Sequence, residues 1–239
     1  IKKAIINSEP NEIVLIAGKG HEDQQIYKNK IFHISDKQIV KNLKLRIKIL
    51  SKKEQNFLQN KLILKKIKGN YKLENFEGLA IDSRMIKKKN LFITIKGKNN
   101  DGRKFIPDAL KKGAKYIVSS KLIKKYKKKT IIVKNEISFL KQFAKLKRLK
   151  SLAKIIAITG SAGKTSLKNL IKELLQNFEK THSSPRSFNN HFGVPVSLSN
   201  LSTEDRYGVF EVGMSKSGEI NDLSKLIQPH VGIITNIGE

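Results

Sequence analysis

The sequence predicts an α/β protein with parallel sheets, and three observations lead to this prediction. Strand-like and helix-like runs alternate along most of the 239 residues. The strand-like runs are rich in Ile and Val and apolar at consecutive positions, as is typical of strands buried on both faces. One such run leads through a glycine-containing loop directly into a helical pattern. Strands separated by helices favour a sheet with helices on both of its faces.

The first predicted elements lie before residue 74. Residues 12–17 form a short apolar strand-like run that ends in Gly18-Lys19-Gly20, and a helical pattern begins at about Asp36. Residues 44–73 are rich in Lys, Leu and Ile and contain few turn residues. We interpret them as a connector into a new domain.

Two βα rhythms follow the connector. In the first, strands are predicted at 76–82, 90–96, 115–119 and 130–133, with helices at 105–112 and 136–150. The second begins with the strand at 155–159 and continues with strand-like runs at 207–213 and 230–235. The predicted domains are therefore residues 1–43, the connector 44–73, a domain at 74–150 and a domain at 151–239.

Composition excludes several classes of protein. The chain has no Cys, which excludes disulfide frameworks and thiolate metal sites. It has no apolar run of about 18 residues, so we expect no membrane insertion, and a cytoplasmic protein is the default prediction. The net charge of +29 comes from 43 Lys and six Arg spread along the whole chain. This even spread favours a solvated lysine-rich surface over a specific nucleic-acid site.

The loop between the predicted strand at 155–159 and the next helix is the main candidate site. Apolar residues at 167, 170, 171, 174, 175 and 178 give one face of that helix. Glycines in such a loop let backbone N–H groups surround a phosphate at the start of a helix. Lys164 is placed to reach the β- and γ-phosphates of ATP, and the Thr165 hydroxyl to bind Mg²⁺. The candidate ATP-binding residues are Gly160, Ser161, Ala162, Gly163, Lys164, Thr165 and Ser166.

The loop departs from the full P-loop spacing, because Ile158 stands where a first glycine is usual. The alternative is a glycine turn whose Lys faces solvent, although such a turn has no need for Lys and Thr in succession. Glu211 ends a buried strand-like run and is the candidate second metal ligand and catalytic residue with Lys164. Its alternative is a strand-end carboxylate in water. His182, His191 and His230 do not have the spacing of a metal site.

Four segments together resemble the Mur ligases, a family of ATP-dependent amide-bond-forming enzymes. They are TGSAGKTS (159–166), SFNNHFGVPVSL (187–198), FEVGMSKSGEI (210–220) and HVGIITNIGE (230–239). Residues 81–120 resemble the family's UDP-substrate domain. The first 43 residues resemble the end of a second member, which adds the third peptide residue, with Gly18 and Glu22 at its amino-acid site. The resemblance therefore implies a piece of a fusion of two family members, consistent with a chain that begins without Met.

The resemblance implies an incomplete parallel-sheet P-loop-type ATPase domain, preceded by a smaller α/β UDP-substrate domain and a short Rossmann-like tail segment. It implies that ATP and Mg²⁺ are used to join UDP-MurNAc-tripeptide to D-Ala-D-Ala, in a complete enzyme that is monomeric. A fragment is expected to be inactive alone. Carried over by motif, the substrate-binding residues are Ser83, Arg84, Asp101, Gly102, Asn189 and Asn190.

The sequence leaves other functions open. Ser215-Lys216 stands where the family usually has Asn-His, and Lys98 and Arg103 are further departures. These departures keep a non-catalytic nucleotide-binding remnant as an alternative. A folylpolyglutamate-synthase-like ligase is a second alternative, and a P-loop regulator or nucleic-acid-stimulated NTPase is a third.

Overall fold

The structure is a computed structural model that describes residues 24–27, 30–33, 52–68, 75–97, 100–186 and 188–237. It divides into two compact units, Ile1–Ser51 and Lys52–Glu239. In the first unit, strands β1 (Gln24–Tyr27) and β2 (Lys30–His33) pair antiparallel. The strand predicted at 12–17 and the helix predicted from Asp36 lie outside the described residues, as do Gly18 and Glu22.

The second unit contains two four-stranded sheets, and the first has the strand order β3-β4-β5-β6 with all neighbours parallel. Each predicted strand in this part is present but shorter than predicted, because the sheet hydrogen bonds cover the central residues alone. The elements are β3 (Leu79–Ala80), η1 (Ser83–Met85), β4 (Leu91–Ile93), η2 (Gly102–Phe105), α4 (Ile106–Lys111), β5 (Tyr116–Ser119), η3 (Lys124–Lys129) and β6 (Thr130–Ile132).

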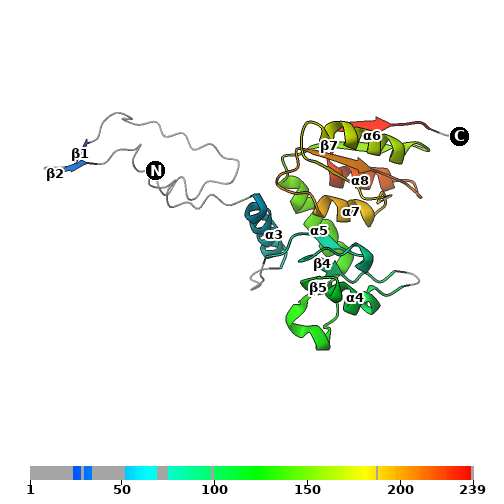
Figure 1. Cartoon of the computed structure of the whole chain (residues 1–239), viewed down its shortest axis with the longest axis horizontal. Helices are drawn as coiled ribbons and strands as arrows, with labels where there is room; N and C mark the ends of the chain where they lie inside the picture. Colours follow the sequence, from blue (N-terminus) through cyan, green and yellow to red (C-terminus); the bar gives the residue numbers. More distant parts are fainter. Residues whose placement is uncertain are drawn as a thin grey trace. The chain divides into compact units, whose positions relative to one another are not determined.

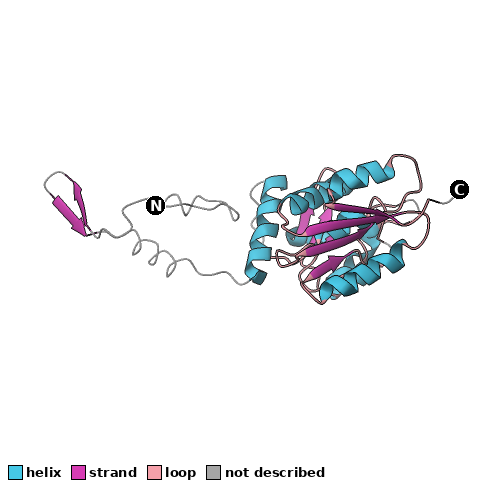
Figure 2. Ribbon diagram, turned by 90° about the horizontal axis from the view of Figure 1, so that it is seen from above, coloured by secondary structure: helices cyan, strands magenta, loops and turns pink. Residues whose placement is uncertain are grey.

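The second sheet has the order β10-β7-β9-β8, and its neighbouring strands are again parallel. Helices lie on both faces of this sheet (Figure 2), which confirms the predicted α/β fold with parallel sheets. The elements are β7 (Lys154–Thr159), α6 (Lys164–Gln176), β8 (Thr181–Ser183), α7 (Gly193–Ser199), β9 (Tyr207–Glu211), α8 (Glu219–Ile227) and β10 (Val231–Ile234).

Helix α5 (Glu136–Leu149) packs against both parts of the second unit (Figure 1). It begins at Asn135, whose side chain accepts a hydrogen bond from the Ser138 N–H and so caps the helix. Phe143 packs in the core of the first sheet and Ala144 in the core of the second. Near its end, Arg148 donates to the Ile227 carbonyl at 2.6 Å, which satisfies an acceptor at the end of α8. One helix therefore contributes to two cores.

The predicted connector at 44–73 contains a helix, α3 (Lys52–Lys68), that belongs to the second unit. Ile63 and Leu64 are buried in the first core, and α3 packs against α5. The Asn60 amide donates to the Phe76 carbonyl at 3.2 Å and also accepts from Lys147 at 2.7 Å. Lysines on the other positions of α3 obscure its apolar stripe in the sequence, so interpreting the whole segment as a connector was wrong for residues 52–68.

Candidate functional site: a phosphate loop beside a buried carboxylate

The loop between β7 and α6 turns at two glycines with left-handed backbone conformations. Gly160 has φ of 134° and Gly163 has φ of 77°, values that L side chains rarely adopt. At Gly160 a side chain would also collide, because an added Cβ would lie 2.1 Å from the Thr235 hydroxyl. The 13-residue helix α6 begins directly after this turn, and its first N–H groups have no partner within the helix. Backbone donors and the helix dipole therefore converge on this loop.

A second segment, Thr235-Asn236 after β10, holds the loop in place. The Asn236 carbonyl accepts from the Ser161 N–H at 3.0 Å, and the Asn236 side-chain oxygen accepts from the Ala162 N–H at 2.9 Å. The Thr235 hydroxyl donates to the Ala162 carbonyl at 2.6 Å. These contacts follow from the pairing of β10 with β7 in the sheet. Sequence reasoning missed both residues, because the order of strands in the sheet is not readable from local pattern.

The Lys164 side chain lies across the loop. Its ammonium donates to the Gly160 carbonyl at 2.6 Å and to the Ser161 carbonyl at 3.1 Å. The positive charge is thus held above the turn where backbone amides gather, which is a suitable arrangement for an anionic ligand. Ser166 lies in the first turn of α6 and is exposed.

Glu211, at the end of β9, is buried at 1% exposure beside this loop. One of its carboxylate oxygens accepts from the Thr165 hydroxyl at 2.8 Å, and the other accepts from the Asn189 amide at 2.8 Å. The structure therefore brings together Thr165, Glu211 and Asn189 from three separate segments. Lys168, which the sequence analysis did not select, lies 3.7 Å from the same carboxylate.

Thr165 and Glu211 offer a hydroxyl and a carboxylate, the hard oxygen donors that Mg²⁺ prefers. Among the described residues there is no cluster of three or more His, Cys, Asp or Glu that could hold a metal alone. This donor set fits a magnesium ion that takes its other ligands from nucleotide phosphates and water. The fit rests on the chemistry and placement of the two side chains.

Asn190 does not share the environment of Asn189. Its side-chain oxygen accepts from the Phe192 N–H at 3.0 Å and from the Gly193 N–H at 2.9 Å. It thus satisfies two backbone donors at the start of α7. In this structure the side-chain oxygen of the second Asn contacts the backbone before α7, and its substrate-binding role stays a prediction.

The other predicted substrate residues lie in the first sheet's part of the unit, after β3 and β4. Ser83 is buried in η1, and Arg84 is paired with Asp82 at 2.7 Å. Asp101 caps η2 and pairs with Arg103, whose hydrogen bonds lower the Asp101 pKa to about 2. At Gly102 an added Cβ would lie 2.7 Å from the Ile95 carbonyl, so the position requires glycine. Both segments follow strands of one parallel sheet and so lie at the same edge of it.

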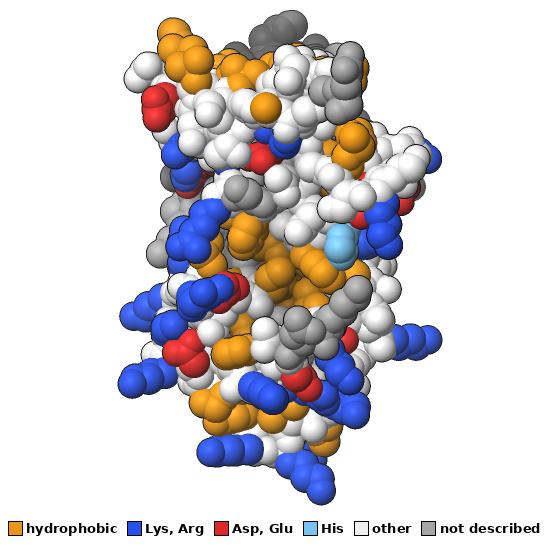
Figure 3. All heavy atoms as spheres, turned by 90° about the vertical axis from the view of Figure 1, so that its right-hand side faces the viewer, with side chains coloured by type: hydrophobic (Ala, Val, Ile, Leu, Met, Phe, Trp, Pro, Cys, Tyr) orange, Lys and Arg blue, Asp and Glu red, His pale blue; other side chains and the backbone are white. Residues whose placement is uncertain are grey.

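A cavity of about 620 Å³ lies between the two sheets of the second unit. It is flanked by β3 and β8, the edge strands of their sheets, and by α3 and α7. Figure 3 shows an apolar hollow at mid-height on one face of the molecule, with Lys and Arg side chains around it. At one end of the cavity lies Asp82. The hydrogen bond from Arg84 is the main cause of its lowered pKa, and the Arg186 charge adds to the effect. Positive charges from both parts of the unit therefore act on Asp82.

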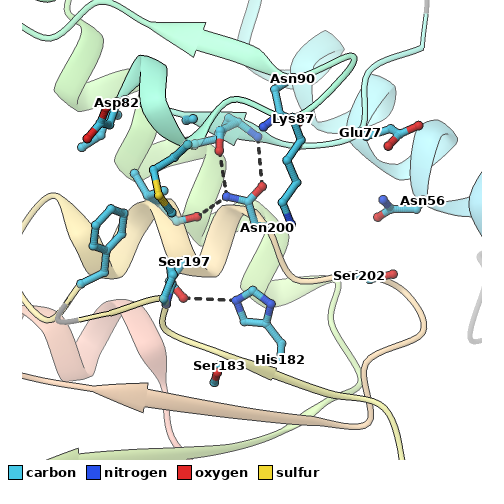
Figure 4. A pocket seen from close by; sticks show the side chains of 18 of the residues that line it. Asn56, Glu77, Asp82, Lys87, Asn90, His182, Ser183, Ser197, Asn200 and Ser202 are labelled. Atoms are coloured by element: carbon cyan, nitrogen blue, oxygen red, sulfur yellow. Dashed lines mark hydrogen bonds between the residues drawn. The ribbon is translucent and has the colours of Figure 1, made fainter. Parts of the chain in front are cut away.

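Asn200 joins the two parts across this cavity (Figure 4). Its side-chain oxygen accepts from the Leu79 N–H at 3.0 Å, and its amide donates to the Leu79 carbonyl at 2.9 Å and the Val196 carbonyl at 2.8 Å. The side chain therefore pairs with edge strand β3 as a neighbouring strand would. Gly78 permits this approach, because an added Cβ would lie 2.3 Å from the Asn200 oxygen.

We expect Asn200→Ala to lower the free energy of unfolding by about 2 kcal/mol, because it leaves the backbone polar groups of Leu79 without these partners. Urea unfolding followed by circular dichroism measures the change. Asn221→Ala, at an exposed position of α8, is the control and should change stability by less than about 0.5 kcal/mol. Equal stability of the two variants would contradict the bridging role of Asn200.

The three histidines singled out in the sequence each have a packing or hydrogen-bonding role. His182 is half-buried beside the Ser197 hydroxyl at 3.1 Å, and desolvation lowers its pKa to about 4. His230 accepts from the Ile155 N–H at 2.8 Å, and the His191 ring packs on Phe192.

The unusual Ser215-Lys216 pair donates both backbone N–H groups to the Glu219 carboxylate at the start of α8.

Comparison with protein families agrees with this arrangement. The Mur ligase family catalytic domain model matches residues 75–148, and the Mur ligase middle domain model matches residues 158–239. The second match contains the phosphate loop, Asn189 and Glu211. The chain belongs to the Mur ligase family. The matched ranges begin at residue 75, so the relationship inferred for residues 1–43 stays a prediction.

Two curated relatives of the same name illustrate the similarity. The UDP-N-acetylmuramoyl-tripeptide–D-alanyl-D-alanine ligase of Rickettsia prowazekii is 40% identical over 166 residues, covering 69% of this chain and 37% of that protein. The ligase of the same name from Bacillus subtilis is 33% identical over 171 residues, covering 71% of this chain and 37% of that protein. The chain thus spans less than half of the length of these relatives.

Solved structures agree with the fold. A crystal structure of MurF from Acinetobacter baumannii has a TM-score of 0.64 and 28% identity, covering 77% of this chain and 41% of that one. MurF ligase from Thermotoga maritima in complex with ADP has a TM-score of 0.56 and 28% identity, covering 68% of this chain and 38% of that one. Among the described residues, no helix has the length and apolar character needed to cross a membrane.

Proposed function

We propose that this chain carries the nucleotide-binding part and the UDP-substrate part of a ligase that joins D-Ala-D-Ala to UDP-MurNAc-tripeptide. The observation that supports the proposal most directly is the meeting of Thr165, Glu211 and Asn189 next to a loop crossed by Lys164. The names of the family relatives supply the substrates. The proposal assigns ATP to the loop and a magnesium ion to Thr165 and Glu211.

The chemistry that this part would serve is activation of a carboxylate. The terminal carboxylate of the tripeptide attacks the γ-phosphorus of ATP, which gives an acyl phosphate and ADP. The amine of D-Ala-D-Ala then attacks the acyl carbon, and inorganic phosphate leaves. A bound Mg²⁺ would neutralise phosphate charge during this transfer.

The chain's own residues contribute positioning and charge. Backbone N–H groups of residues 163–165 orient the phosphates, because those of Ser161 and Ala162 donate to Asn236. Lys164 compensates the charge that moves toward the leaving ADP. Asn189 and Thr165 hold the Glu211 carboxylate from both sides, which keeps its oxygens in fixed directions. Ser83, Arg84, Asp101 and Gly102 are proposed to form the edge that receives the UDP part. The Arg186 charge acts on Asp82, which precedes Ser83 and lines the cavity.

Binding of a nucleotide to the purified chain tests this proposal. We expect a fluorescent ATP analogue to bind more tightly with Mg²⁺ than with EDTA, and UDP-MurNAc-tripeptide to bind to the same chain. Folate in place of the UDP substrate tests the folylpolyglutamate-synthase alternative. Binding of DNA with a steep salt dependence, together with no binding of the UDP substrate, would instead favour a nucleic-acid-stimulated NTPase.

We also predict that the chain alone forms no UDP-pentapeptide, because it matches less than half of the ligases that carry out this reaction. The assay is chromatographic detection of UDP-pentapeptide from ATP, UDP-MurNAc-tripeptide and D-Ala-D-Ala. A complete family enzyme serves as the positive control. Turnover by the isolated chain at a rate near that control would contradict the prediction.

A further inference from the structure

Lys168 is a buried cation that the proposed mechanism does not yet use. It lies on α6, three residues after Thr165, so both side chains point from the helix to the end of β9. Its side chain is 2% exposed, and its ammonium lies 3.7 Å from a Glu211 carboxylate oxygen that is itself equally buried. A lysine is rarely buried to this extent without a partner that requires its charge.

The ammonium of Lys168 has a second contact, to the loop that carries Asn189. It donates to the Arg186 carbonyl at 2.6 Å. Arg186 has φ of 50°, a left-handed conformation that is uncommon for a residue other than glycine and has to be maintained by its surroundings. Three residues later, Asn189 donates to Glu211 at 2.8 Å. Lys168 therefore holds both the carboxylate and the turn that precedes the amide partner of that carboxylate.

We propose that Lys168 is a positioning residue that fixes Glu211 and the turn at Arg186 in the arrangement required for a magnesium–nucleotide complex. This inference rests on the proposed function. Without the ammonium, the buried carboxylate loses its counter-charge and the Arg186 turn loses a hydrogen-bond donor. Ligands that are not held in advance bind a metal less tightly, because part of the binding free energy is used to order them.

Repulsion between the Lys168 ammonium and Mg²⁺ would act against this role. The total charge of the assembled site shows that this repulsion is outweighed. A triphosphate and a carboxylate together carry more negative charge than one Mg²⁺ neutralises, so the assembled site remains net negative. One further cation beside it is then favourable. We therefore expect removal of Lys168 to weaken Mg²⁺-dependent binding rather than to strengthen it.

The test separates nucleotide affinity with Mg²⁺ from affinity in EDTA, using the full chain and a fluorescent ATP analogue. In Lys168→Met we expect affinity in EDTA to stay within about threefold of wild type, because the loop and Lys164 are unchanged. The gain in affinity on adding Mg²⁺ should fall at least about tenfold. Lys172→Met, one turn further along α6 at a partly exposed position, should keep the full gain.

Further measurements keep the inference testable if Lys168→Met does not fold. Lys168→Gln keeps a hydrogen-bond donor without the charge and should also lose most of the Mg²⁺-dependent gain. In the wild-type chain, the ¹⁵Nζ resonance of Lys168 should shift when Mg²⁺ is added to the nucleotide complex. An unchanged gain in a folded variant, or an Nζ resonance that Mg²⁺ does not move, would overturn the inference. A wild-type chain that binds no nucleotide would instead refute the proposed function itself.

Discussion

Lys164→Ala is expected to reduce amide-bond formation by about 10³-fold or more in a complete ligase that carries this loop. The structure places its ammonium on the Gly160 and Ser161 carbonyls, directly over the turn proposed to hold the phosphates. Because charge builds up on the bridging and terminal phosphate oxygens during transfer, removal of this cation affects the transition state more than the folded state. Steady-state release of ADP, with kcat and KM determined separately, measures the effect.

The control for this prediction is Lys172→Ala on the same helix, which should retain wild-type turnover. Thermal unfolding of the isolated chain should differ little between Lys164→Ala and wild type, because Lys164 is only partly buried. Wild-type turnover in a folded Lys164→Ala enzyme would exclude the loop as the phosphate site. It would leave the family assignment intact, since that assignment rests on matches over much more of the chain.

The free energy of unfolding of this chain should rise with pH above 7, because Lys147 is buried in the second unit. It is 1% exposed, and its ammonium donates to the side-chain oxygens of Asn56 at 2.8 Å and Asn60 at 2.7 Å. Burial lowers the pKa of Lys147 from 10.5 to about 7, an effect that the nearby Asp205 carboxylate partly offsets. Neutral amides hydrogen-bond to the amine without compensating a charge.

The sign of this effect follows from proton binding in the two states. Between pH 7 and 10 the unfolded chain keeps the proton on Lys147 while the folded chain releases it, so raising the pH favours the folded state. This residue contributes a slope of up to about 1.4 kcal/mol per pH unit in that window and almost none below it. Urea unfolding at a series of pH values from 6 to 10 measures the slope.

Lys147→Met isolates that contribution. The variant should be less stable overall, because Asn56 and Asn60 lose a donor, but its slope above pH 7 should be smaller than that of wild type. Lys145→Met, at an exposed position of the same helix, should keep the wild-type slope. The same slope in Lys147→Met and wild type would show that Lys147 does not titrate in this window.

Local sequence pattern was sufficient to predict those elements whose apolar spacing shows directly which face is buried. The strand-like run before Gly160 and the apolar spacing from Leu167 predicted β7 and α6, and both are present. The strands of the first sheet were also predicted in position, although each is shorter. Helix α3 was missed within the interpreted connector, because its buried positions are interrupted by lysines. Strand β8 and helices α7 and α8 were not predicted as separate elements.

The candidate site was predictable in part for the same reason. Glycines, Lys164 and Thr165 are adjacent in sequence, and Glu211 stands at the end of a strand, so a shared sheet edge could be inferred. The hydrogen bonds that the Asn190 side-chain oxygen accepts were not predictable from its motif, because they depend on how the backbone turns into α7. Thr235 and Asn236 were missed because they reach the loop through the pairing of β10 with β7.

The sequence by itself determined the α/β class, the phosphate loop and its helix, and the resemblance to one enzyme family. Each of these depends on residues close together along the chain or on motifs in a fixed order. The tertiary structure alone decided which side chains meet: Lys168 with Arg186 and Glu211, Asn200 with Leu79, and Lys147 with Asn56 and Asn60. The physical reason is that these contacts join segments up to 121 residues apart, and they form only once strand order and helix packing bring those segments together.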